Sequence, residues 1–285
     1  MKTILITGAN GQLGCCLQDI ATQYSESFQF LFTDIEEMDI SNIDTIYDFC
    51  SRHNVDVIIN AAAYTQVDLA EKEVELAHLI NSEGVSNIVE VCKRLSIFLV
   101  HISTDYIFDG TYNGAYTEEM IPNPISVYGK SKWEGEAKIL ESSIPSIIIR
   151  TSWLYSEYGK NFLKTILKLT KEKEEIQVVS DQTGTPTYAG DLAEVVMKCI
   201  EKRDQVLKPE IFHFSNSGVC NWYAFALLIN QISGEKCKIT PISEKDYPTN
   251  AKRPKNSLFS KEKLKKFLNI EIAPWEESVQ KCLKK

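Results

Sequence analysis

Short runs of consecutive apolar residues alternate, in the first half of the chain, with longer segments in which apolar residues recur every three or four positions. The apolar runs cover residues 3–7, 28–33, 55–60, 96–103 and 146–150. The segments with helical spacing cover residues 12–24, 43–53, 73–95 and 128–142. Continuous apolar runs are typical of parallel strands buried on both faces, and their alternation with helices of ten or more residues indicates helices on both sides of the sheet. We therefore predict an α/β fold built on a doubly wound parallel sheet.

The pattern changes after about residue 150. Helical spacing continues, but the last fifty residues are rich in basic residues and include Pro248, Pro254 and Pro274. No internal repeat and no low-complexity linker separates the two parts. We predict that residues 1–150 form one domain and that residues 151–285 form mainly a smaller C-terminal α/β domain packed against it. Residues 186–205 are expected to pack back onto the first domain.

Composition and charge exclude several classes of protein. Hydrophobic residues make up 44% of the chain, which is enough for a sizeable core, and the formal charge of 31 − 39 = −8 argues against broad binding to nucleic acid or an anionic membrane. No stretch approaches the roughly 20 apolar residues of a membrane-spanning helix, and the apolar start is too short for a signal peptide. We therefore expect a cytoplasmic protein. The eight cysteines form no C-x-x-C pair, which predicts reduced thiols and no metal site.

Three glycines follow the first apolar run at G-x-x-G-x-x-G spacing, Gly8, Gly11 and Gly14, and a helix follows them. Glycines permit a tight turn, a close approach to a pyrophosphate and close packing of helix on sheet, and the helix N-terminus offers free N–H groups to an anion. Asp34 ends the second apolar run, where an acid can bind both ribose hydroxyls and would repel a 2′-phosphate. This context predicts a Rossmann-type NAD(P)-binding domain in residues 1–150, with NADH favoured over NADPH. The alternatives are a plain glycine-rich turn and an aspartate that caps a loop.

Tyr128 and Lys132 are four residues apart, which puts them on one face of the predicted helix. A tyrosine titrates near pH 10, and a neighbouring ammonium together with an oxidised nicotinamide favours the phenolate. A pKa lowered in this way would make Tyr128 a general acid for reduction near neutral pH. Thr104 follows the fourth apolar run, at the edge where open parallel sheets bind ligands, so we expect it to hydrogen-bond a substrate carbonyl. The alternative is that Thr104 and Asp105 cap the following turn.

In this order, the motifs resemble those of the extended short-chain dehydrogenases/reductases and, within them, the dTDP-4-dehydrorhamnose reductase family. The matching segments span residues 1 to about 260 and are Gly8–Gly14, Ala62–Asp68 with Glu71, Ser103–Gly110, Tyr128–Lys132 with Gly135 and Glu136, Arg150–Trp153 with Tyr155, Asn161–Phe162, Asp181–Thr187 and Arg253–Pro254. The resemblance implies reduction of the C4 keto group of dTDP-4-dehydro-L-rhamnose to dTDP-L-rhamnose with NAD(P)H, a step of nucleotide-sugar biosynthesis. It also implies that Tyr128 protonates the oxygen, that Lys132 holds the nicotinamide ribose and tunes Tyr128, and that Thr104 binds the keto oxygen.

The resemblance further implies residues around each ligand. The cofactor is expected to contact Gly8, Asn10, Gly11, Gln12, Leu13, Gly14, Asp34, Asp39, Ile40, Ala63, Tyr64, Thr65, Tyr128 and Lys132. The sugar is expected to contact Thr104, Asp105 and Trp153, although the alternative for Trp153 is a core aromatic residue. Arg253 and residues 181–187 are candidate contacts for the substrate diphosphate, because arginine suits bidentate phosphate recognition; the alternative is a surface arginine.

Some members of this family are described as dimers bridged by magnesium through acidic side chains, one of them near the glycine turn. In this sequence Cys15 and Cys16 follow Gly14, and soft thiols are poor magnesium ligands. The metal is therefore not carried over to this chain, and we expect a monomer or a homodimer.

Other functions of the same fold stay open at this point. They are another nucleotide-sugar reductase, an epimerase, a 4,6-dehydratase, and a non-catalytic regulatory subunit resembling that of methionine adenosyltransferase. A dehydratase needs an extra acid–base pair beside Thr104, and related dehydratases carry Asp-Glu there, whereas Asp105 is followed by Tyr106. A binding module has no need for Thr104, Tyr128 and Lys132 together, so the sequence favours an enzyme.

Overall fold

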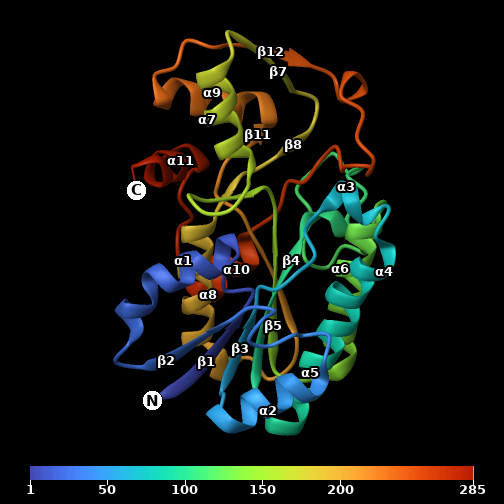
Figure 1. The fold of residues 1–285 in the computed structure, drawn as a ribbon, viewed down its shortest axis with the longest axis vertical. Coiled ribbons are helices and arrows are strands. Elements are labelled where there is room, and N and C mark those ends of the chain that lie inside the picture. Colours follow the sequence, from blue (N-terminus) through green and yellow to red (C-terminus); the bar gives the residue numbers. More distant parts are fainter. Residues whose placement is uncertain (285) are drawn as a thin grey trace.

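A parallel sheet forms the centre of the molecule, as Figure 1 shows for the computed structural model, which describes residues 1–284. Within these residues the sheet has six strands in the order β10-β5-β4-β3-β1-β2. They are β1 (Lys2–Thr7), β2 (Phe28–Thr33), β3 (Val57–Asn60), β4 (Phe98–Thr104), β5 (Ser146–Thr151) and β10 (Glu210–Phe214). Because β1 pairs with β2 on one side and β3 on the other, the strand order reverses there. Ligands bind at the carboxyl ends of the strands beside such a point.

Helices cover both faces of this sheet (Figure 1). One face packs against α1 (Gln12–Ala21), α8 (Ala189–Glu201) and α10 (Glu262–Leu268). The other packs against α2 (Ile43–His53), α5 (Gly84–Leu95) and α6 (Val127–Ser142). Neighbouring strand residues belong to opposite cores, so that Ile4 faces the first set of helices and Leu5 faces the second. The prediction of a doubly wound parallel sheet of the Rossmann type is confirmed.

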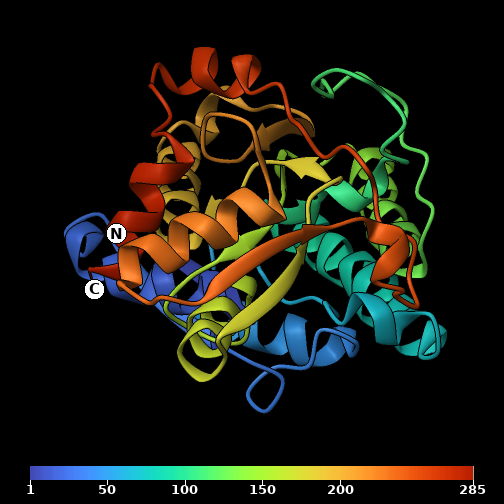
Figure 2. The same ribbon diagram turned by 90° about the horizontal axis from the view of Figure 1, so that it is seen from above.

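The second half of the chain also contributes to this layer. β10 extends the sheet beyond β5, α8 packs on α1, and α10 contacts β10. The remaining elements form a smaller lobe over the carboxyl ends of the strands (Figures 1 and 2). Its helices are α7 (Phe162–Glu172), α9 (Trp222–Ser233) and α11 (Trp275–Leu283), and its paired strands are β7 (Glu175–Val179) with β12 (Lys238–Ile242), β8 (Thr183–Gly184) with β11 (Cys220–Asn221), and β6 (Leu154–Tyr155) with β9 (Thr187–Tyr188). Residues 151–284 therefore contribute both to the layer of the central sheet and to the smaller lobe.

Two helices differ from those that the apolar pattern predicts. The segment 73–95 is divided into α4 (Val74–His78), a π-helical turn (Leu79–Glu83) and α5, and a short helix α3 (Val67–Ala70) precedes it. The helix predicted to reach residue 24 ends at Ala21 and continues as a 3₁₀ turn over Thr22–Tyr24. Further 3₁₀ turns lie at Asp105–Ile107, Arg203–Gln205 and Glu244–Asp246.

The cysteines lie mainly in the interior of the molecule. All eight cysteines are reduced, of which Cys15 is half-buried and the others are buried, so they pack as small side chains. No helix within residues 1–284 is both long and apolar enough to cross a bilayer. Over the same residues, no cluster of three or more histidine, cysteine or acidic side chains could hold a metal ion.

Candidate active site

The glycine turn lies between β1 and α1, at the carboxyl edge of the sheet. Gly8 has a φ of +64°, and a Cβ there would lie 2.7 Å from the Cα of Ala62. A Cβ on Gly14 would lie 2.4 Å from the carbonyl oxygen of Ala9, so glycine is required at both positions. α1 begins after Gly11 without a capping hydrogen bond from any described side chain. Its first N–H groups are therefore free to bind an anion, and the turn fits a dinucleotide pyrophosphate.

The residues predicted to surround the adenosine half of the cofactor lie on neighbouring strand ends. The Asp34 carboxylate, just after β2, accepts hydrogen bonds from the backbone N–H of Asn10 at 3.0 Å and of Ile35 at 2.9 Å. Asp39 accepts from the N–H of Ser41 at 2.8 Å, and Ile40 is buried beside Gly84 of α5. The structure thus brings Asp34, half-buried, directly beside the glycine turn.

The loop after β3 carries the next predicted group. Ala63 is half-buried, Tyr64 is buried and Thr65 is exposed. The Tyr64 hydroxyl donates to Glu73 at 2.8 Å. The Tyr64 backbone N–H and carbonyl both bond the side chain of Asn81, at 2.9 and 3.0 Å. This loop is therefore held in a fixed conformation beside the crevice.

Two residues of the turn use their side chains within the protein. The Gln12 carboxamide oxygen accepts from Ser156 at 3.1 Å and from Asn161 at 2.8 Å, in the loop after β6. Leu13 is buried in the core between α1 and the sheet. Both residues were predicted to contact the cofactor. Because their side chains are used within the protein, the group that each can present to a ligand is its backbone N–H in the first turn of α1.

Tyr128 and Lys132 lie on α6 where it crosses the carboxyl end of β4. Ser126 caps this helix by accepting from the N–H of Gly129 at 3.1 Å. The Tyr128 ring packs edge-on against Tyr106, with centroids 5.4 Å apart, and its phenol lies close enough to the Thr104 side chain for that side chain to favour a lower pKa. Thr104, the last residue of β4, is buried. The structure therefore places Thr104 and Tyr128 together, as the sequence predicts.

Lys132 does not bond Tyr128. Its ammonium donates to the carbonyl of Ile102 at 2.7 Å and lies 3.3 Å from Nε2 of His101. Burial raises the pKa of Tyr128 to about 12, against the opposing effect of Thr104, and lowers the pKa of Lys132 to about 8. Within the protein itself, burial thus disfavours the phenolate and the ammonium is directed elsewhere. The predicted lowering of the Tyr128 pKa also involves an oxidised nicotinamide and stays a prediction.

Asp105 connects the strand end to the C-terminal segment of the chain. It is buried, it accepts from Thr104 at 3.1 Å, and it accepts a short hydrogen bond from Ser257. Burial raises its pKa to about 6, although both hydrogen bonds oppose this shift. Asp105 therefore titrates close to physiological pH beside Thr104 and Tyr128.

Trp153, the third predicted sugar contact, takes an unusual conformation for a residue other than glycine, with a φ of +48°. Its ring stacks on Trp222 at 3.7 Å between centroids, and a Cβ on Gly184 would lie 2.6 Å from it. Trp222 donates in turn to Gln182 at 3.0 Å. The sequence gives no signal for Trp222, because its stacking partner lies 69 positions earlier in the chain.

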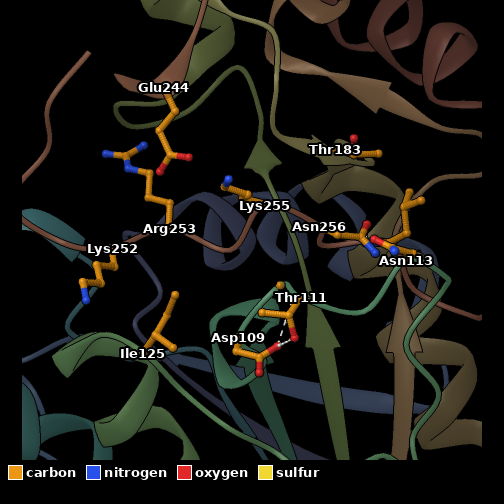
Figure 3. A pocket seen from close by; sticks show the side chains of 12 residues that line it. Asp109, Thr111, Asn113, Ile125, Thr183, Glu244, Lys252, Arg253, Lys255 and Asn256 are labelled. Atoms are coloured by element: carbon orange, nitrogen blue, oxygen red, sulfur yellow. Dashed lines mark hydrogen bonds between the residues drawn. The ribbon is translucent and has the colours of Figure 1, made fainter. Parts of the chain in front are cut away.

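A cavity of about 700 Å³ adjoins these residues, between the carboxyl edge of the sheet and the smaller lobe (Figure 3). Two stretches of chain, residues 109–113 after β4 and residues 252–258, supply most of its lining. Thr183 and Glu244 of the lobe also line it. Its lining holds three basic side chains, Lys252, Arg253 and Lys255, and two acidic ones, Asp109 and Glu244. Because the basic side chains outnumber the acidic ones, we call it the positive cavity. Arg253 also donates to Asp68 of α3 at 2.8 Å. Tyr128 does not line the cavity, but Ser257, which bonds Asp105, lies between two residues that do.

The fold and the presence of Tyr128 and Lys132 four residues apart on α6, at the sheet edge, define the class, an extended short-chain dehydrogenase/reductase, which is an oxidoreductase that uses NAD(P)H. A family model described as the RmlD substrate binding domain matches residues 1–285, and the chain belongs to that family. A curated dTDP-4-dehydrorhamnose reductase from Aggregatibacter actinomycetemcomitans is 41% identical over 288 residues, which is 98% of each chain.

Solved structures agree with this assignment. A dTDP-4-dehydrorhamnose reductase from Bacillus anthracis, in complex with NADP, is 39% identical with a TM-score of 0.94, and the match covers 100% of this chain and 99% of that one. A dTDP-glucose 4,6-dehydratase from the same organism has a TM-score of 0.84 over 100% and 96% of the two chains, but only 18% identity. That second likeness shows the fold alone.

Proposed function

We propose that this protein reduces the C4 keto group of dTDP-4-dehydro-L-rhamnose to dTDP-L-rhamnose with NAD(P)H, in nucleotide-sugar biosynthesis in the cytoplasm. Support comes from the family, from the glycine turn, and from the contact between Thr104 and Tyr128 at the end of β4. That contact carries the proposal, because it places a hydrogen-bond donor and a phenol where one carbonyl oxygen can reach both. The protein acts as a monomer or a homodimer.

The side chains divide the work of the reduction. When bound, the dihydronicotinamide supplies the hydride. The raised pKa keeps the Tyr128 phenol protonated at neutral pH, so Tyr128 holds the proton that the sugar oxygen receives. The Thr104 hydroxyl, whose single proton is donated to Asp105 in this structure, would turn to donate to the same oxygen and fix its position. Lys132 binds the nicotinamide ribose with an N–H that its contacts to Ile102 and His101 leave over.

The positive cavity is proposed to receive the diphosphate and base of the substrate. Lys252, Arg253 and Lys255 favour an anion. Ser257, two residues after Lys255, hydrogen-bonds Asp105 at the end of β4. The nucleotide would then lie in the cavity while the sugar reaches past Asp105 to Thr104. Trp153, held in position by Trp222, is proposed to contact the sugar ring.

Asp34 leads us to favour NADH over NADPH. Its carboxylate lies beside the glycine turn, where it accepts hydrogen bonds from ribose hydroxyls and repels a 2′-phosphate. The solved relative from Bacillus anthracis is in complex with NADP, so both cofactors have to be compared directly.

Purified protein is expected to oxidise NADH in the presence of dTDP-4-dehydro-L-rhamnose. Tyr128→Phe should lower kcat at least ~100-fold, since general acids contribute about that much or more, while cofactor affinity measured by fluorescence titration stays within a small factor. Exposed Tyr47→Phe on α2 is the matched control and should leave kcat unchanged. An unaltered rate in Tyr128→Phe would remove Tyr128 from the reaction, and the ratio of kcat/KM for the two cofactors settles the preference.

A dehydratase is the second candidate and is less well supported. It needs a second carboxylate after Asp105, whereas the next residue is Tyr106, whose ring packs against Tyr128 and whose pKa is raised by burial. A dehydratase also retains its cofactor between turnovers. Stoichiometric NAD in the purified protein, together with no consumption of NADH, would favour the dehydratase over the reductase.

A further inference from the structure

A row of polar side chains runs beneath the active site, within the sheet. Thr7 of β1, Asn60 of β3 and His101 of β4 are register partners on neighbouring strands. They lie on the face of the sheet that packs against α5 and α6. Each follows by two positions a residue of the apolar row Leu5, Ile58 and Leu99, toward the carboxyl end of its strand. All three side chains of the polar row are buried, Asn60 and His101 completely. Buried polar groups are costly unless they are bonded, so this row calls for a physical explanation.

Hydrogen bonds join the row end to end and connect it to Lys132. The Thr7 hydroxyl bonds the Asn60 carboxamide at 2.8 Å, and the same carboxamide lies 3.1 Å from Nδ1 of His101. Nε2 on the other side of the ring lies 3.3 Å from the Lys132 ammonium. The imidazole is therefore fixed from both sides, and its only described charged neighbour is the lysine of the active site.

The N–H donors of Lys132 suggest what His101 does, because each acceptor near the ammonium determines where the remaining N–H groups can point. An ammonium has three donors and no acceptor. The Ile102 carbonyl accepts one of them, and Nε2 of His101, when it carries no proton, accepts a second, which leaves one for a ligand. Two fixed acceptors determine the direction of the third N–H. Without His101, a four-carbon side chain held only at Ile102 could rotate.

We propose that His101 is a positioning residue of the reductase: its Nε2 accepts a hydrogen bond from the Lys132 ammonium and so directs the remaining N–H toward the ribose of the cofactor. The inference rests on the proposed function. It requires the tautomer with the proton on Nδ1, which donates to the carboxamide oxygen of Asn60. In the structure the Asn60 amide nitrogen faces Nδ1 and its oxygen accepts from the Thr7 hydroxyl. The proposed tautomer therefore needs that amide turned by half a turn, so that its oxygen faces the ring and its nitrogen donates to the Thr7 oxygen.

The charged state of Lys132 depends on the same contact. Removing an acceptor of the ammonium favours neutral lysine, so the alkaline limb of the kcat profile should move to lower pH. The titratable and charged groups that face Lys132, directly or through one neighbour, are His101 on β4, Tyr128 and Glu136 on α6, Asp105 after β4 and Arg150 on β5. Glu136 favours the ammonium, but it is itself paired with Arg150 at 2.7 Å.

Two substitutions, His101→Asn and His101→Gln, test the proposal. Both introduce a carboxamide, and they differ by one methylene in how far that carboxamide extends from the backbone. The amide of His101→Asn reaches about as far as Nδ1 and keeps the contact with Asn60, whereas that of His101→Gln reaches about as far as Nε2 and restores an acceptor for Lys132. We expect His101→Asn to lower kcat about tenfold to a hundredfold, the usual effect of misplacing a reacting group by about 1 Å. His101→Gln should recover at least tenfold of this loss and keep the alkaline limb of the wild type.

Each result supports or overturns the inference. Thermal melting of both variants controls for folding, since both place an amide in the same buried site. Equal kcat and equal pH profiles in the two variants, whether high or low, would make His101 a purely structural residue and overturn its positioning role. A wild-type protein that does not reduce the nucleotide sugar would instead overturn the proposed function, and that result is recognised before either variant is made.

Discussion

At the scale of single residues, the site depends on ionisable groups that burial shifts in opposite directions. Lys132 loses affinity for its proton, while Tyr128 and Asp105 gain it. All three shifts have the same first cause, because removal from water penalises whichever form carries charge. The sequence identifies these residues through their spacing, but it contains no information on their depth.

Asp105 gives this shift a measurable effect on stability. Its pKa is 3.8 in the unfolded chain and about 6 in the folded one. Between these values the folded state binds more protons, so the free energy of unfolding falls as pH rises from about 4 to 6, by up to about 3 kcal/mol. Asp105→Asn lacks this titration. Urea unfolding at several pH values should show that, from pH 4 to 6, the free energy of unfolding of the wild type falls relative to that of the variant. If the two proteins show the same pH dependence, Asp105 is not the titrating group.

At the scale of elements, the π-helical turn shows where the apolar pattern stops being informative. Residues 73–95 have helical spacing throughout, yet Asn81 in the middle is buried and bonds the Tyr64 backbone twice and Ser131 once. A Cβ on Gly135 of α6 would lie 2.2 Å from the Asn81 carbonyl. Contacts with two other segments therefore determine the local geometry, and π turns are frequent where a helix adapts to a functional site.

Asn81→Ala is expected to weaken both folding and cofactor binding. It removes three buried hydrogen bonds and leaves the Tyr64 backbone unsatisfied, which should cost about 3 kcal/mol of unfolding free energy and raise KM for the cofactor as the Tyr64 loop loosens. Asn230→Ala, which removes one hydrogen bond to Cys237 in the smaller lobe, is the control. Urea denaturation and initial rates provide the measurements. An unchanged KM for the cofactor would show that Asn81 has no role in shaping the Tyr64 loop.

The strands and long helices of the first 150 residues could be predicted because their apolar patterns are local. Helix 43–53 agrees at both ends and strand 28–33 does as well. β10, β7 and β12 escaped prediction, because β10 is a short edge strand with polar residues at 210 and 213 and the other two are held by pairing across more than 60 residues. The site shows the same division. Thr104, Tyr128 and Lys132 lie in local motifs, whereas His101, Trp222 and Ser257 meet the site only through the fold.

At the scale of the whole molecule, the C-terminal segment joins the lobe to the sheet edge. Asp68 of α3 accepts from the Ala251 N–H at 3.0 Å and from Arg253 at 2.8 Å. Farther along, Ser257 bonds Asp105, and the Ser260 N–H donates to the carbonyl of Tyr116 at 2.8 Å. The positive cavity is closed on one side by this segment.

Arg253→Ala tests the cavity as the nucleotide site. If Arg253 binds the diphosphate, its loss removes charged hydrogen bonds worth about 1.5–3 kcal/mol, so KM for the nucleotide sugar should rise about tenfold to a hundredfold. KM for NADH should stay the same. Arg94→Ala on α5, which removes an exposed guanidinium paired with Glu90, controls for net charge. Equal KM for the sugar in wild type and Arg253→Ala would place the diphosphate elsewhere.

The position of β10 has a consequence for the order in which the chain matures. As the polypeptide leaves the ribosome, its first 150 residues contain five of the six strands, but β5 then ends the sheet with an unpaired edge and α1 lacks α8, against which it packs. An open edge of this kind recruits other strands. The nascent domain therefore stays vulnerable to aggregation until residues 189–214 have emerged, and a chaperone that binds extended apolar segments would act during that interval.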